Sequence, residues 1–211
     1  MRTLSSLILL LSLLLPMAAN AAGSYGVPES VSRERVSNRG LKGKTRGAMK
    51  KATVRVAKPS LIARKMKTYK NEKYGISIGY PSDWEVKDNH MNTIVSFISP
   101  LAGSKDTLTE NMNILVEDMK AESLEATTRA ALGQLKTIEN FTLVSSESLV
   151  LDNRSAKALT YTASQSPLLK FKQVWMIHDN QLYVFTFAAS AVDFREYAKI
   201  FDKMLGTLKI Q

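Results

Sequence analysis

The pentapeptide Gly75–Gly79 matches G-x-S-x-G, the pattern around the nucleophilic serine of many hydrolases. In those enzymes the serine lies on a strained turn that leads from a strand into a helix. Here Ser77 lies within an alternating apolar pattern, which predicts a strand rather than such a turn. A general base would have to be His90 or His178, the two histidines of the chain. A hydrolase built on Ser77 is therefore only the third functional hypothesis, behind two binding functions.

Two other patterns could bind phosphate or metal. Gly40–Thr45 resembles the end of a P-loop, but Asn38 occupies the place of the first glycine and no predicted strand precedes it. Asp83, Asp88 and His90 are close in sequence but lack the spacing of a zinc site. The absence of cysteine excludes disulfides, thiol catalysis, iron–sulfur clusters and a lipid-modified cysteine. We therefore expect no metal, no cofactor and no catalytic residue.

Residues 1–21 have the order of a secretory signal peptide. Arg2 precedes an apolar run from Leu4 to Leu15, Pro16 interrupts the run, and the small residues Ala19–Ala21 suit cleavage. The run is shorter than the about 20 apolar residues of a spanning helix, although an uncleaved anchor or a buried helix is the alternative. We expect cleavage near Ala21, a periplasmic or secreted protein, and no transmembrane span in the mature chain.

The positive charge of the chain is concentrated near its beginning. Residues 23–70 contain fourteen Lys or Arg and two Glu, a net charge of +12, whereas residues 71–211 have a net charge of −3. Because residues 22–69 have few large apolar side chains to bury, we expect them to form a disordered basic arm. Within its last part, residues 59–69, helical spacing of Ile62, Met66 and Tyr69 allows a short helix.

A flexible cationic arm is attracted to polyanions through counterion release. Near an anionic bilayer, each Lys or Arg contributes about 1 kcal/mol. We expect the arm to dock on an acidic protein or an anionic envelope surface; a solvated tether without a partner is the alternative. No specific nucleic acid is expected, because no aromatic side chains alternate with the charges. The predicted docking residues are Arg33, Arg35, Arg39, Lys42, Lys44, Arg46, Lys50, Lys51, Arg55, Lys58, Arg64, Lys65 and Lys67.

Residues 70–211 predict an α+β domain with an antiparallel sheet flanked by helices. The predicted strands are 76–80, 93–99, 112–118, 142–151, 156–163, 169–177 and 182–188. Asp152-Asn153 and Asp179-Asn180 tolerate positive φ, so both predict tight hairpins between neighbouring strands. Ser123 is a suitable N-cap for one helix, and a second helix is expected to start near Ser190, in a capping-box spacing. The oligomeric state stays open.

The segment Tyr74–Trp84, YGISIGYPSDW, resembles the opening motif of the PsbP-like proteins, which include a photosystem II extrinsic subunit and bacterial DcrB-like envelope proteins. The segments 97–100, 112–116 and 201–205 also resemble that family. The resemblance covers residues 70–211 and implies an α/β/α sandwich with non-enzymatic roles in binding or assembly. It brings no catalytic residue with it. The motif residues have structural roles: Tyr74, Gly75, Tyr80, Pro81 and Trp84.

The leading hypothesis is an exported, non-enzymatic accessory, assembly or binding protein of the bacterial cell envelope, docked through its basic arm. The alternative is a small-molecule or metal carrier that uses a cavity between the sheet and a helix, with the arm as a spacer. Most aromatic residues are expected to pack in the core. Lys170 and Lys172 flank Phe171 on one predicted strand, and their face of the sheet is a candidate surface for a protein partner.

Overall fold

The computed structural model describes residues 64–101, 108–119, 123–163 and 168–211. The predicted signal peptide and the predicted arm up to residue 63 lie outside these ranges. The described strands are β1 (Met66–Asn71), β2 (Ile76–Pro81), β3 (Glu85–Asp88), β4 (Val95–Ile98), β5 (Asn111–Asp118), β6 (Thr142–Leu151), β7 (Arg154–Ala163), β8 (Leu169–His178), β9 (Gln181–Ser190) and β10 (Lys209–Ile210). The α-helices are α2 (Leu124–Leu135) and α3 (Phe194–Leu205), and the 3-10 turns are η2 (Glu72–Tyr74) and η3 (His90–Asn92).

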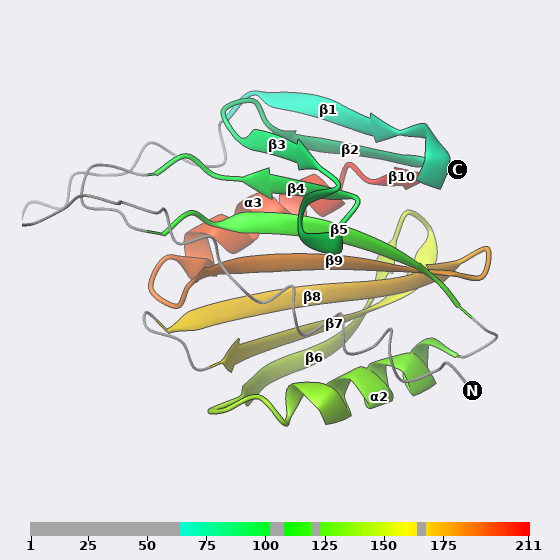
Figure 1. Ribbon diagram of the computed structural model, residues 1–211, viewed down its shortest axis with the longest axis vertical. Helices are drawn as coiled ribbons and strands as arrows, with labels where there is room; N and C mark the ends of the chain where they lie inside the picture. The colour runs from blue at the N-terminus through cyan, green and yellow to red at the C-terminus, as the bar shows by residue number, and fades with distance from the viewer. Residues whose placement is uncertain (1–63, 102–107, 120–122, 164–167) are drawn as a thin grey trace, which may run out of the picture. The chain divides into compact units, whose positions relative to one another are not determined.

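The strands form two sheets in which every pair is antiparallel. A seven-stranded sheet has the order β3-β4-β5-β9-β8-β7-β6, and a three-stranded sheet has the order β1-β2-β10 (Figure 1). The predicted class, an α+β fold with an antiparallel sheet and flanking helices, is confirmed. The small sheet was not predicted, because β1 and β10 carry no strong strand pattern of their own.

Two-residue turns connect the longest strands. Asp152 and Asn153 join β6 to β7 with φ angles of 47° and 61°, and Asp179 and Asn180 join β8 to β9 with 48° and 59°. Positive φ at both central residues defines a type I′ turn, whose twist matches that of the flanking strands. Both predicted hairpins are therefore confirmed, and they fix the register of four strands.

The helices cover opposite faces of the seven-stranded sheet. The Ser123 hydroxyl accepts a hydrogen bond from the Ala126 amide at 3.1 Å, which confirms the predicted N-cap of α2. This helix packs on β7 and β8 over a cluster that includes Tyr161, Phe171 and Trp175. The other face packs against α3 and β2 over a second cluster, so the sheet is the middle layer of three.

The start of α3 differs slightly from the prediction. Strand β9 continues to Ser190, and the helix begins at Phe194. The Ser190 hydroxyl accepts from the Asp193 amide at 3.1 Å and donates to the Asp193 carboxylate at 3.0 Å. These bonds close a turn between strand and helix and do not form the predicted capping box, because the N-cap of α3 is Asp193 and Ser190 lies three residues before it.

The structure corrects the prediction for residues 64–69. Met66–Asn71 is the strand β1, paired with β2 along its whole length, and not part of a helix or of an arm. The Ser82 amide also donates to the Lys65 carbonyl at 2.8 Å. A helix of three turns is marginal alone, whereas pairing with β2 satisfies the backbone groups on one side of β1 along its whole length. The folded domain therefore begins several residues before residue 70.

Candidate functional site

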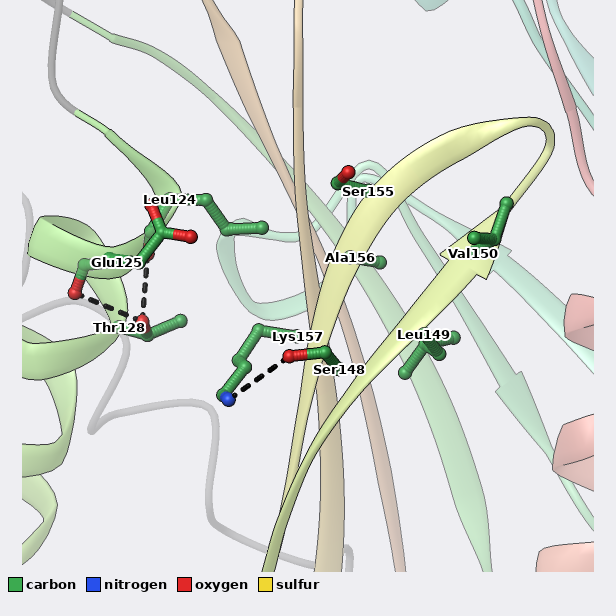
Figure 2. Close-up of a pocket in the computed structure, with 9 residues that line it drawn as sticks. All are labelled: Leu124, Glu125, Thr128, Ser148, Leu149, Val150, Ser155, Ala156 and Lys157. Atoms are coloured by element: carbon green, nitrogen blue, oxygen red, sulfur yellow. Dashed lines mark hydrogen bonds between the residues drawn. The ribbon is translucent and has the colours of Figure 1, made fainter.

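A cavity of about 320 Å³ lies between the first turns of α2 and the β6–β7 hairpin. Figure 2 shows the helix on one side and the two strands on the other. The tight turn at Asp152 sets the register that places Ser148 opposite Lys157 and Val150 opposite Ser155. The lining residues are Leu124, Glu125 and Thr128 of α2, Ser148, Leu149 and Val150 of β6, and Ser155, Ala156 and Lys157 of β7.

The cavity wall combines aliphatic side chains with hydroxyl groups, one acidic residue, Glu125, and one basic residue, Lys157. Lys157 Nζ donates to Ser148 Oγ at 3.3 Å. The Thr128 hydroxyl donates to the carbonyls of Leu124 at 2.7 Å and Glu125 at 3.1 Å, so it is engaged with the helix backbone (Figure 2). The volume is at the lower end of the range for small-molecule sites. This arrangement suits the binding of a small molecule or of an extended chain segment.

Strand β6 forms an exposed rim beside this cavity. It is the outermost strand of its sheet, and among the described strands it pairs with β7 alone (Figure 1). Val150 is 72% exposed and Val144 is 51% exposed, although both are apolar. The strand has one charged residue, Glu147, in ten positions. Cavity and rim together form the candidate binding site of the domain.

The far end of the same hairpin is fastened to β10. The Asp152 carboxylate accepts hydrogen bonds from the Ile210 amide at 2.9 Å, from Arg154 at 2.7 Å and from Lys209 at 3.2 Å. The bond from the Ile210 amide, helped by the two cations, holds the pKa of Asp152 below its usual range despite burial. Arg154 also approaches His178 Nε2 at 3.3 Å. The hairpin that lines the cavity is thus held at its tip.

The predicted docking residues within the described chain are few. Arg64 forms an ion pair with Asp83, whereas Lys65 and Lys67 are exposed at the start of β1. The other predicted docking residues, from Arg33 to Lys58, lie outside the described ranges. Lys170 and Lys172 do not stand free on the sheet as expected. They lie over the Phe194 and Phe201 rings of α3 at 4.8 and 5.8 Å, because the helix covers that face.

The residues of the opening motif have structural environments. Gly75 adopts a φ of 62°, and a Cβ there would lie 2.6 Å from the Gln211 carbonyl oxygen. Pro81 ends β2, and Trp84 is buried with its ring 6.5 Å from that of Tyr197. Tyr74 closes η2, where its amide donates to the Asn71 side chain. Tyr80 packs against Phe97, with the two ring centroids 5.2 Å apart.

The serine and acidic side chains that the sequence analysis considered for catalysis or metal binding do not have the arrangement of an active site. Ser77 lies inside β2, opposite Lys70 of β1 and Lys209 of β10, rather than at a turn into a helix. The Asp88 carboxylate accepts a hydrogen bond from the Tyr69 hydroxyl at 2.7 Å. Burial, together with this bond, raises the pKa of Tyr69 to about 12. Among the described residues, no three His, Asp or Glu side chains form a metal-binding group.

Comparison with known proteins identifies the family. The family model for PsbP-like proteins matches residues 54–204, so the chain belongs to the PsbP-like family. The structure of LpqN from Mycobacterium tuberculosis, a protein involved in cell envelope biogenesis, has a TM-score of 0.57 at 13% identity, over 70% of this chain and 91% of LpqN. No curated protein matches the sequence.

Two further solved structures share the fold. Cyanobacterial PsbP (CyanoP) from Synechocystis has a TM-score of 0.52 at 13% identity, over 69% of this chain and 92% of its own. PA94 from Pseudomonas aeruginosa has a TM-score of 0.50 at 14% identity, over 69% and 97%. Neither α2 nor α3, the α-helices of the described chain, has the length and apolar character needed to cross a bilayer.

The carrier hypothesis expected a cavity between the sheet and a helix, but sequence reasoning did not locate it and missed the exposed rim. The cavity depends on how α2 packs over a hairpin that follows it in sequence, which no local pattern encodes. A signal for the rim was present in β6, whose sequence TLVSSESLVL lacks the alternation of apolar and polar residues seen in half-buried strands. That irregularity indicates a strand whose two faces are both largely exposed.

Proposed function

We propose that this chain is an exported, non-enzymatic accessory, assembly or binding protein of the bacterial cell envelope. In this proposal the basic arm docks the domain on an acidic protein or an anionic membrane surface. The observation that carries it is the charge division of +12 in residues 23–70 against −3 in residues 71–211. The role of LpqN in cell envelope biogenesis, on a similar fold, supports an envelope setting.

Two contacts at the start of the described domain guide how much of the arm is deleted. Arg64 pairs with Asp83, and the Lys65 carbonyl accepts from the Ser82 amide, so the domain needs its residues from Arg64 onward. A deletion of residues 23–63 spares both contacts. It removes ten Lys or Arg and two Glu, a net charge of +8. Docking and folding can therefore be tested separately.

The test compares the intact chain with the deletion on vesicles of phosphatidylglycerol and phosphatidylethanolamine and on envelope fractions. We expect the intact chain to sediment with both at low salt and to be released at high salt, because salt screens exposed charges. The deletion should lose this retention and keep its melting temperature. A full-length variant with those ten Lys and Arg replaced by Gln controls for length. Equal retention of all three chains would overturn the proposal.

The comparison also separates the two kinds of docking surface. Retention on phosphatidylglycerol vesicles indicates the membrane itself, because these vesicles contain no protein. Retention on envelope fractions alone indicates an acidic protein partner. Both results must disappear with the arm, since residues 64–211, which remain after the deletion, have a net charge of only +1.

The cavity beside α2 favours a second candidate function, a carrier of small molecules. A ligand that binds only the folded state at 100 times its dissociation constant adds about 2.7 kcal/mol of stability. A thermal-shift screen should then find compounds that raise the melting temperature. Ser148→Phe, which fills the cavity from β6, should abolish the shift, and Val192→Phe, at a surface residue that is 89% exposed, should preserve it.

A further inference from the structure

The β6–β7 hairpin determines which backbone groups of β6 point away from the sheet. Leu151 and Arg154 flank its two-residue turn, and in such a turn the flanking residues form a hydrogen-bonded pair. Hydrogen-bonded and open pairs alternate along an antiparallel ladder. The amides and carbonyls of Ser146, Ser148 and Val150 therefore point outward, toward the free edge.

Among the described residues, this edge lacks most of the features that normally prevent strand addition. Natural edge strands are protected by lysine, proline, a short length or a covering element. The edge strand β1 of the small sheet follows this rule with Lys67 and Lys70. Strand β6 has ten residues, contains neither lysine nor proline, and exposes Val144 and Val150. Its one irregularity is a register shift between Leu143 and Ser145.

We propose that β6 pairs with β6 of a second copy of this chain, antiparallel and about a two-fold axis at Ser148. The single charge of the strand selects this register. With Ser146 opposite Ser148 of the partner subunit, Glu147 would face its own counterpart, and like charges directly opposite are destabilising. With Ser148 on the axis, Glu147 faces Leu149 of the partner subunit instead.

The length of the paired segment favours the same register. The bulge after Leu143 and the turn at Asp152 bound the regular part of β6, which is residues 145–151. A two-fold axis at Ser148 is at the centre of that segment, so all seven residues can pair. An axis at Ser146 or Val150 would carry the pairing into the bulge or the turn. The dimer joins two seven-stranded sheets into one.

The pairing would also complete the cavity. Side chains directly opposite each other in an antiparallel pair lie on the same face. Ser148 and Val150 line the cavity, so Ser148 and Ser146 of the partner subunit would lie beside them at its open side. The two cavities of the dimer would thus be neighbours across the axis. The inference is independent of the proposed docking of the arm.

The first test measures association of the full chain by sedimentation equilibrium at high salt, which suppresses contacts made by the arm. We expect a dimer. Val150→Lys should weaken association at least about tenfold, which corresponds to 1.4 kcal/mol, because lysine protects an edge. Val192→Lys adds the same charge at another exposed valine and should leave the constant unchanged. A monomer at the highest soluble concentration would overturn the proposal. The edge would then be available to an extended segment of another protein.

The second test fixes the register and uses the absence of cysteine from the chain. Ser148→Cys places two thiols opposite each other on the axis, within the Cα separation of a disulfide. Mild oxidation should therefore give a covalent dimer. Ser146→Cys, two residues away, faces Val150 of the partner subunit and should cross-link at least about tenfold more slowly. Equal rates for the two variants would overturn the register.

Discussion

The two edges of the seven-stranded sheet are built in opposite ways. Strand β3 has four residues, three of which are charged, and it lies next to the small sheet through the Tyr69–Asp88 hydrogen bond. Strand β6 has ten residues with one charge, and it borders a cavity. Charge and brevity protect the first edge, whereas the second keeps its backbone groups available.

This difference indicates that the two ends of the sheet have different roles. Near β3, the fully buried Phe97 of β4 packs against the rings of Tyr69 and Tyr80, with centroids 5.6 and 5.2 Å away. Near β6, the apolar residues Val144 and Val150 contribute surface rather than core. The β3 end should therefore determine stability, and the β6 end should determine interactions.

Among the substitutions that test this comparison, Phe97→Ala should change the free energy of unfolding most. Removal of a fully buried phenylalanine costs about 3–5 kcal/mol, and we expect the melting temperature to fall by about 10 °C or more. Val144→Ala at the other end should change the free energy of unfolding by less than about 0.5 kcal/mol, because its side chain is half exposed. Chemical denaturation of both variants checks this. Similar losses at both ends would contradict the proposed difference in roles.

Asp152→Asn should have an intermediate effect at the β6 end. Loss of the charge weakens three hydrogen bonds, and we expect a destabilisation of about 2 kcal/mol at pH 7. The folded pKa of Asp152 is lowered, so its contribution is complete above the unfolded value of about 3.9 and is lost as the pH falls toward the folded value. Denaturation curves should therefore converge in acid.

A matched control for Asp152 is available in the second hairpin. Asp179 occupies the equivalent turn position, but its side chain is 81% exposed. We expect Asp179→Asn to have little effect on the free energy of unfolding at pH 7, because a surface substitution usually changes stability by less than about 0.5 kcal/mol. Equal effects at the two turns would mean that the link to β10 is unimportant.

Tyr69→Phe should have a smaller effect than Asp152→Asn, about 1 kcal/mol at neutral pH, because it removes the hydroxyl that donates to Asp88 and accepts from Asn71. The raised pKa of about 12 means that this stabilisation is present below the unfolded value of about 10 and is lost as the pH rises toward 12. The difference between wild type and variant should therefore decrease over that interval. A constant difference up to pH 12 would contradict the assignment.

Much of the large sheet follows from local sequence patterns. The bounds of β6 were predicted correctly, and both Asp-Asn turns have the expected conformation, because these features depend on neighbouring residues. Strand β1 was missed because the spacing of Met66 and Tyr69 also suits a helix. Its pairing with β2 is a tertiary contact, and tertiary contacts override weak local preferences.

The candidate site could not be predicted in the same way. The order of strands makes β6 an edge, and strand order depends on long-range packing that local periodicity does not contain. The cavity needs Thr128 and Lys157, which come from separate elements. The charge division, in contrast, is a property of composition, and the sequence was sufficient to reveal it.

The position of β2 between β1 and β10 has a consequence for the order of folding during synthesis. The Gly79 amide donates to the Thr207 hydroxyl at 2.7 Å across 128 residues, and β10 begins two residues after that threonine. The hairpin of β1 and β2 is synthesised early, but its third strand, β10, is synthesised much later. Until Ile210 has been made, the apolar side of that hairpin stays exposed to chaperones and proteases.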